Sequence, residues 1–128
     1  MKRILLVDDD AAFREPLCEW LSRNGYEVQT AQNGSVALKL YRQQAADLVI
    51  TDLIMPEAEG LETIGALRRL QPNVKIIAMS GGGRIGPIEY LTIARNLGAH
   101  RVLAKPFSCQ EILDAVESSL ADESKQPA

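Results

Sequence analysis

Short, unbroken apolar runs recur along the chain, and the two clearest ones end in polar residues. Ile4–Val7 is followed by Asp8, and Leu48–Ile50 is followed by Thr51 and Asp52. Such runs are typical of strands that are buried on both faces, as in a parallel sheet. Three more segments are predicted to be strands: Lys75–Met79, Val102–Ala104 and Tyr26–Ala31. The last of them alternates polar and apolar residues, which suits an edge strand with one face in water.

Each predicted strand is followed by a segment in which apolar residues repeat at helical spacing. These segments are Phe13–Leu21, Val36–Tyr41, Leu61–Arg68, Ile88–Leu97 and Ile112–Leu120. Asn33 is predicted to cap the second helix, and Ser108 with Glu111 forms a capping box for the last one. Pro16 falls inside the first helix, where it should kink the helix or shift its start.

Five strand–helix units in succession predict a doubly wound α/β fold. Right-handed helical crossovers between parallel strands place helices on both faces of one sheet. The 128 residues are one domain's worth of chain. A chain of this length buries enough surface to fold without disulfides or metals. We expect the domain to span residues 1–121 and residues 122–128 to form a disordered tail.

The composition argues against several classes of protein. With 14 basic and 17 acidic residues the net charge is -3, so no basic excess indicates nucleic-acid binding. The apolar runs are too short to span a membrane. Cys18 and Cys109 fit no metal-binding or redox spacing, and they are predicted to be two buried thiols in a reducing compartment. A cytoplasmic protein is therefore expected.

Polar residues gather where the predicted strands end. In parallel α/β sheets, ligands bind at the carboxyl ends of the strands. Asp8–Asp10 follow the first strand, Asp52 ends the third, Ser80 ends the fourth and Lys105 ends the fifth. Two carboxylates about 4 Å apart repel each other by roughly 4 kcal/mol at an effective dielectric constant near 20. Such a cluster is kept by a bound cation or by a proton, and short aspartate side chains suit Mg²⁺.

The lysine and the serine add complementary chemistry to these carboxylates. Lys105 supplies a positive charge and Ser80 a hydroxyl donor, so the set can accept a phosphoryl group and stabilise its oxygens. Taken alone, Asp10 is better explained as the N-cap of the first helix. The whole set at four strand ends is not explained by capping.

Four segments carry a resemblance to a known family. They are ILLVDDD at the first strand, LVITDLIMPEAEG around Asp52, IIAMSGGG at Ser80 and VLAKPF around Lys105. In this order and at these strand ends, they resemble the response-regulator receiver domain of two-component signalling, over about residues 2–121. The resemblance implies a flavodoxin-like three-layer sandwich with a five-stranded parallel sheet in the order 2-1-3-4-5. It also implies a stand-alone signalling switch rather than an enzyme, apart from its self-catalysed phosphoryl transfer and autodephosphorylation.

The resemblance implies roles for the acidic residues. Asp52 resembles the phosphoacceptor, which takes its phosphoryl group from a histidine kinase or a phosphotransfer protein. Asp9 and Asp52 resemble direct Mg²⁺ ligands, together with the backbone carbonyl of Ile54. Asp8 resembles the second member of the acid pair and is expected to reach the ion through water.

The remaining roles concern the phosphoryl oxygens and the output. Ser80 resembles the hydroxyl residue that turns toward the phosphoryl group. Lys105 resembles the lysine that forms a salt bridge with the phosphoryl group, and its peptide bond to Pro106 is expected to be cis. The family often has an aromatic switch residue where this chain has Val102. Activation is therefore expected to act through the loop 81–86 and the fourth helix, and to change the face formed by that helix, the fifth strand and the fifth helix toward an unknown downstream protein.

An enzyme remains the alternative. Phosphatases of the haloacid dehalogenase type also begin with an apolar strand and an Asp-x-Asp motif, here Asp8 and Asp10. This class resembles the chain less well, because it needs further acidic metal ligands after the lysine and would leave Asp52 without a purpose. The two hypotheses differ in which aspartate becomes phosphorylated, Asp52 or Asp8.

Overall fold

The computed structural model describes residues 1–53, 59–80, 98–99 and 101–121. The five strands are β1 (Arg3–Val7), β2 (Glu27–Ala31), β3 (Leu48–Asp52), β4 (Ile76–Ser80) and β5 (Arg101–Ala104). The helices within the described ranges are α1 (Ala11–Arg23), α2 (Gly34–Gln43), α3 (Glu59–Leu70) and α5 (Cys109–Ala121). The predicted fourth helix, the loop 81–86 and the predicted tail 122–128 lie outside the described residues.

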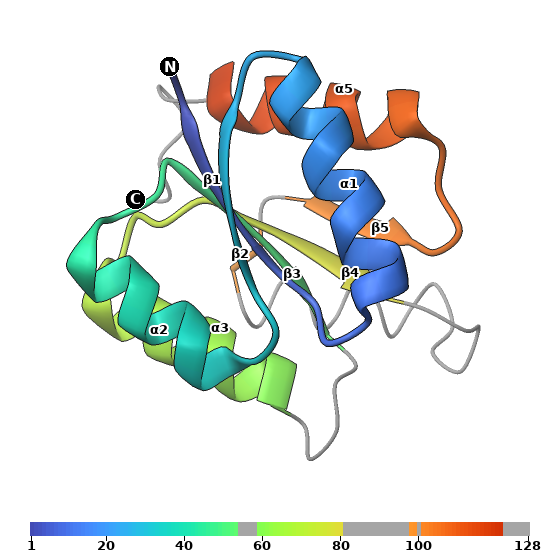
Figure 1. Cartoon of the computed structure of the whole chain (residues 1–128). Coiled ribbons are helices and arrows are strands. Elements are labelled where there is room, and N and C mark those ends of the chain that lie inside the picture. Colours follow the sequence, from blue (N-terminus) through green and yellow to red (C-terminus); the bar gives the residue numbers. More distant parts are fainter. Residues whose placement is uncertain (54–58, 81–97, 100, 122–128) are drawn as a thin grey trace.

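The strands form one parallel sheet in the order β2-β1-β3-β4-β5, as expected. Helices α1 and α5 cover one face of the sheet, and α2 and α3 cover the other (Figure 1). The doubly wound α/β architecture is therefore confirmed. The polar strand β2 lies at the edge of the sheet, as its alternating sequence predicts.

Two apolar cores lie on the two faces of the sheet because successive strand residues point to opposite sides. In β1, Ile4 and Leu6 belong to the core beneath α1 and α5, whereas Leu5 and Val7 belong to the core beneath α2 and α3. All four side chains are at most 2 % exposed. Burying a side chain of this size stabilises the fold by about 1.5–3 kcal/mol. The unbroken apolar run in the sequence thus reflects burial on both faces.

The helix caps follow the sequence closely. The Asp10 side chain accepts a hydrogen bond from the first turn of α1, and the Asn33 side chain does the same for α2. Ser108 and Glu111 form the predicted capping box, with each side chain accepting from the other's backbone N–H at 3.0 Å. Pro16 lies inside α1, and the start of this helix is not shifted.

The prediction of two buried thiols is wrong. Cys18 is half-buried and Cys109 is exposed, and both are free. Cys109 is the first residue of α5, ahead of the stretch from Ile112 onward that packs on the sheet. Helical spacing places Cys109 on the apolar face, but the first turn lies outside this packed stretch. None of the described helices is long and apolar enough to cross a membrane.

Candidate functional site

Parallel pairing brings the carboxyl-terminal ends of four strands together, along one edge of the sheet that runs across the strands. Asp52 and Ser80 are the last residues of β3 and β4, Asp8 directly follows β1, and Lys105 directly follows β5. The backbone N–H of Lys105 donates to the carbonyl of Ser80 at 2.7 Å, which continues the ladder past β5. The sequence pattern therefore predicts correctly which residues share this edge.

The carboxylates of Asp8, Asp9 and Asp52 form a cluster in which one oxygen atom from each residue lies within 4.8 Å of the other two. Asp8 is fully buried and Asp52 is 6 % exposed, whereas Asp9 is exposed to solvent. Asp8 is also fixed in orientation, because its Oδ1 accepts from the backbone N–H of Asp10 at 3.0 Å. Arg14 donates to the Asp8 carbonyl at 2.8 Å and holds the turn that carries the acid pair.

Lys105 lies against this cluster. Its Nζ is 2.8 Å from Asp8 Oδ2 and 3.2 Å from Asp52 Oδ2. Burial by itself lowers the pKa of Lys105, but the hydrogen bond to Asp8 and the negative charges of Asp52 and Asp8 outweigh it and leave the pKa raised. Lys105 is therefore an ammonium ion at neutral pH, directed at the carboxylates. The Lys105–Pro106 peptide bond is cis, as expected.

An aromatic pair lies beside the lysine. Lys105 Nζ is 4.0 Å from the centroid of the Phe13 ring. Phe107 packs edge-on against Phe13, with ring centroids 5.6 Å apart and planes at 87°. In the sequence Phe13 reads only as an apolar position of the first helix. Phe13 lies in the first turn of that helix, directly after the aspartates, and this position could have indicated that its ring is near the acidic residues.

Ser80 is fully buried at the end of β4. Within the part of the chain that the structure describes, its Oγ has no hydrogen-bond partner. A buried hydroxyl without a partner is costly, and such groups in native proteins call for an explanation. Ser80 lies at the same edge of the sheet as the acidic cluster, so an oxygen atom of a ligand bound there can supply the missing acceptor.

The donor set fits a divalent cation. One ammonium against three carboxylates leaves two negative charges uncompensated within this group of four side chains. All three carboxylates offer hard oxygen ligands, which Mg²⁺ prefers in proteins. Ile54, expected to add a carbonyl ligand, lies outside the described residues. The edge can therefore hold a divalent cation among these carboxylates.

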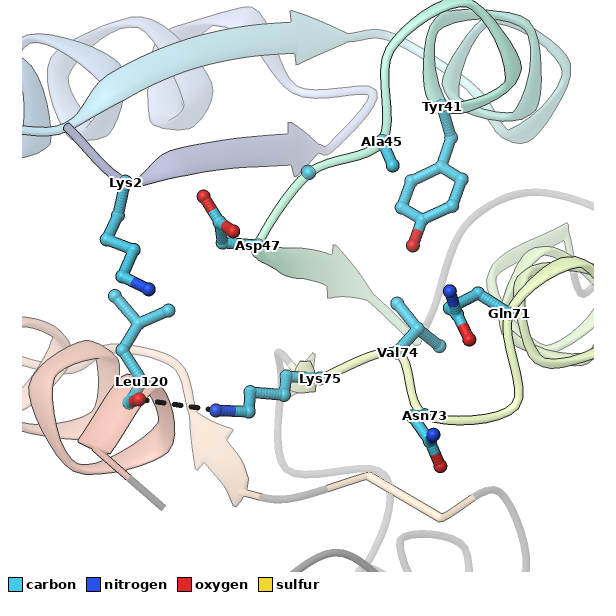
Figure 2. A pocket seen from close by; sticks show the side chains of 10 residues that line it. Lys2, Tyr41, Ala45, Asp47, Gln71, Asn73, Val74, Lys75 and Leu120 are labelled. Atoms are coloured by element: carbon cyan, nitrogen blue, oxygen red, sulfur yellow. Dashed lines mark hydrogen bonds between the residues drawn. The ribbon is translucent and has the colours of Figure 1, made fainter. Parts of the chain in front are cut away.

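A cavity of about 380 Å³ lies at the opposite, amino-terminal edge of the sheet (Figure 2). It is lined by Lys2, Tyr41, Asp47 and Lys75, among others. Lys75 Nζ donates to the carbonyl of Leu120 near the end of α5, at 3.2 Å. This cavity shares no residue with the acidic cluster, and it contains none of the predicted site residues.

Comparison with known proteins gives the same family for most of the chain. The sequence model of the response regulator receiver domain matches residues 4–117. Sporulation initiation phosphotransferase F of Bacillus subtilis is 34% identical over 119 residues, which are 93% of this chain and 94% of that protein. Chemotaxis protein CheY of the same organism is 33% identical, over 92% of this chain and 97% of its own.

Longer proteins match as well. The transcriptional regulator NtrC of Azospirillum brasilense is 37% identical over 117 residues. The chain spans about a quarter of the length of the NtrC relatives that it matches.

Solved structures agree with this family. The response regulator TrrA of Thermotoga maritima, in complex with Mg²⁺-BeF, is 37% identical with a TM-score of 0.80, over 93% of this chain and 99% of that one. A receiver domain protein from Clostridium thermocellum has a TM-score of 0.86 at 25% identity, over 97% and 98% of the two chains. The order of the strands, the acidic cluster and these matches lead to one conclusion: the chain belongs to the response regulator receiver domain family, the phosphoacceptor switches of two-component signalling.

Proposed function

We propose that Asp52 is the phosphoacceptor of this receiver domain, and that a histidine kinase or a phosphotransfer protein supplies the phosphoryl group. One observation carries the assignment: Asp52 is the only carboxylate of the acidic cluster that ends a strand, and it lies 3.2 Å from the Lys105 ammonium. Asp52 is 6 % exposed, whereas Asp8 is fully buried.

The reaction is a nucleophilic displacement at phosphorus. An Asp52 carboxylate oxygen forms a bond to phosphorus, and the bond between phosphorus and the donor's imidazole nitrogen breaks. The electron pair of that bond stays with the imidazole, which takes up a proton. The product is an acyl phosphate on Asp52. Only an ionised carboxylate can make this attack.

We assign Mg²⁺ to Asp9, Asp52 and the backbone carbonyl of Ile54, with Asp8 acting through a water molecule. The close approach of three carboxylate oxygens, one from each residue, supports this assignment. When bound, the ion supplies positive charge to the oxygens of the transferring phosphoryl group. Asp8 is suited to an indirect role because Asp10 and Lys105 already bond its two oxygens.

Lys105 and Ser80 would bind the phosphoryl oxygens. Lys105 is already charged and directed at Asp52. Ser80 contributes a buried hydroxyl without a partner among the described residues. Each group can donate a hydrogen bond to the negative charge that develops on the phosphoryl oxygens. Both groups are present at this edge before the reaction begins.

Output would pass through the face formed by the predicted fourth helix, β5 and α5, toward a downstream protein. Val102 on β5 is half-buried and packs against the core beneath α2 and α3. A short β-branched side chain has one dominant rotamer and little surface to move. The loop 81–86 is therefore the element that we expect to respond.

The cytoplasmic location also stays a prediction.

The phosphatase alternative fits the site less well. Its second aspartate would be Asp10, whose side chain caps α1 by accepting from Ala12 at 3.0 Å. Its nucleophile would be Asp8, which is fully buried and bonded at both oxygens. These contacts hold both residues away from the roles that the alternative requires.

Incubation with acetyl phosphate and Mg²⁺ tests the proposal. Intact-mass spectrometry should detect one phosphoryl group on the wild-type protein and none on Asp52→Asn. Asp10→Asn is the matched control, because asparagine also caps helices and this variant should be phosphorylated normally. An undiminished adduct on Asp52→Asn would overturn the assignment.

A further inference from the structure

Phe13 offers its aromatic face to Lys105 but takes no direct part in the phosphoryl transfer proposed for Asp52. We propose that Phe13 is a positioning residue, whose ring holds the Lys105 ammonium at the phosphoryl-accepting edge when the carboxylates engage other partners. The inference rests on the proposed function, because it concerns the reaction in which Lys105 takes part.

The geometry is that of a cation–π contact. Lys105 Nζ lies 4.0 Å from the centroid of the Phe13 ring, within the distance at which the negative face of a ring attracts an ammonium ion. An ammonium group has three N–H donors. Two have carboxylate acceptors, at Asp8 and Asp52, which leaves the third for the ring. Lys105 is therefore held by partners of two chemical kinds.

The ring itself is fixed in place. Phe13 lies in the first turn of α1, which begins directly after the acidic residues, and its backbone N–H donates to the Asp10 carbonyl at 3.1 Å. Phe107, two residues after Lys105, packs edge-on against it. Edge-to-face pairs of this kind are favourable arrangements of two rings. The pair joins the start of α1 to the segment that carries the lysine.

The two kinds of partner respond differently to a bound cation. Lys105 and a divalent ion would share the negative charge of Asp8 and Asp52, so the ammonium loses part of its attraction to them once an ion is held there. The Phe13 ring has no oxygen ligand to offer, so its attraction for Lys105 is not shared. The ring therefore keeps Lys105 beside Asp52 in the metal-loaded protein.

Two variants distinguish the effect of the aromatic face of Phe13 from the effect of its size. Phe13→Leu keeps an apolar side chain but removes the aromatic face, whereas Phe13→Tyr keeps the face. Acetyl phosphate is the donor, so that no docking protein is involved. We expect the rate constant of phosphorylation to fall about threefold to tenfold in Phe13→Leu and to be restored in Phe13→Tyr. Trp20→Leu, which removes a different aromatic ring from the same helix, should leave the rate unchanged.

A second readout does not depend on activity. In the metal-free protein, the NMR signals of the Lys105 side chain, assigned by their loss in Lys105→Arg, should carry an upfield ring-current shift that disappears in Phe13→Leu and stays in Phe13→Tyr. In a Lys105→Met background, Phe13→Leu should cause no further decrease in rate, because the ring acts through the lysine.

The outcomes distinguish this inference from the proposed function. If the wild-type protein is phosphorylated on Asp52 but Phe13→Leu keeps both the wild-type rate and the wild-type Lys105 signals, the positioning role is wrong and the proposed function stands. Equal further loss in the Lys105→Met background would also overturn the role, since the ring would then act independently of the lysine. If the wild-type protein is not phosphorylated on Asp52, the proposed function itself fails.

Discussion

Lys105 and Lys75 lie at opposite edges of the same sheet, and their ammonium groups meet different partners. Lys105 contacts the carboxylates of Asp8 and Asp52 at 2.8 and 3.2 Å. Lys75 is 9 % exposed and donates to the carbonyl of Leu120 near the end of α5 (Figure 2). Lys105 thus pairs with negatively charged carboxylates, whereas Lys75 donates a hydrogen bond to a backbone carbonyl near the end of a helix.

This difference gives the two lysines different functions. A positive charge at the carboxyl-terminal end of a helix is favourable, because the last carbonyls lack partners and carry the negative end of the helix dipole. Lys75 therefore stabilises the fold at its place. At the other edge, Lys105 lies beside three carboxylates among the described residues, a set of hard oxygen ligands that suits a divalent cation. Burial alone does not distinguish the two lysines; the partners of the ammonium groups do.

The largest expected effect separates the two lysines by activity. Lys105→Met should lower the rate constant of phosphorylation by acetyl phosphate about 100-fold or more, the usual loss when one electrostatic contact to a developing charge is removed. Lys75→Met is the matched control and should leave that rate within about twofold, because its ammonium contacts α5 and not the acidic cluster. Similar losses of rate in the two variants would show that the two lysines do not differ in their effect on phosphorylation.

The next effect concerns metal binding. Asp9→Ala should weaken Mg²⁺ binding by at least about tenfold in calorimetric titration, because a site of few carboxylates cannot replace a lost ligand. The free energy of unfolding should stay the same or rise, since one repelling charge is gone. Asp47→Ala removes a carboxylate from the opposite edge and should leave the affinity unchanged. Unchanged affinity in Asp9→Ala would show that the ion is bound elsewhere.

A smaller effect tests the structural role of Lys75. Lys75→Met should lower the free energy of unfolding by about 1 kcal/mol, because the carbonyl near the end of α5 loses a charged donor. Urea unfolding monitored by circular dichroism measures this change. Ser108→Ala, which removes the cap at the other end of α5, should cost a similar amount. Full stability of Lys75→Met would mean that the contact is incidental.

The smallest effect is the pH dependence that comes from Lys105. Its folded-state pKa is raised above the ordinary value of 10.5, so its contribution to stability is complete below that value and is lost as the pH rises through the folded-state pKa. The difference in unfolding free energy between wild type and Lys105→Met should therefore be constant through the neutral and mildly alkaline range. A decline already near neutral pH would contradict the raised pKa.

Much of this fold can be predicted from local sequence because several signals agree at each position. The apolar run of β1 and the aspartates after it place the acidic residues at a strand end, and the caps at Asp10 and Ser108 fix the starts of the flanking helices. Parallel pairing then brings the strand ends together without any further information. The residues at the site follow from this arrangement.

What sequence reasoning missed depends on contacts between distant segments. The place of Phe13 over Lys105 requires that the start of α1 and the segment after β5 meet with one side-chain geometry, which no periodicity encodes. Cys109 shows the opposite error. Its spacing from Ile112 suits the apolar face of α5, but the first turn of that helix lies outside the packed stretch. Helical spacing gives the face of a helix, and packing decides how far that face is covered.

Chemical trapping identifies the carboxylate that bonds to phosphorus, which we propose is Asp52 at the end of β3. The protein is phosphorylated with acetyl phosphate and Mg²⁺, treated with borohydride, which reduces an aspartyl phosphate to homoserine, and digested for peptide mass spectrometry. We expect homoserine at position 52 and an unmodified aspartate at position 8. Homoserine at position 8, with Asp52 unmodified, would rule out Asp52 as the phosphoacceptor and support the phosphatase alternative.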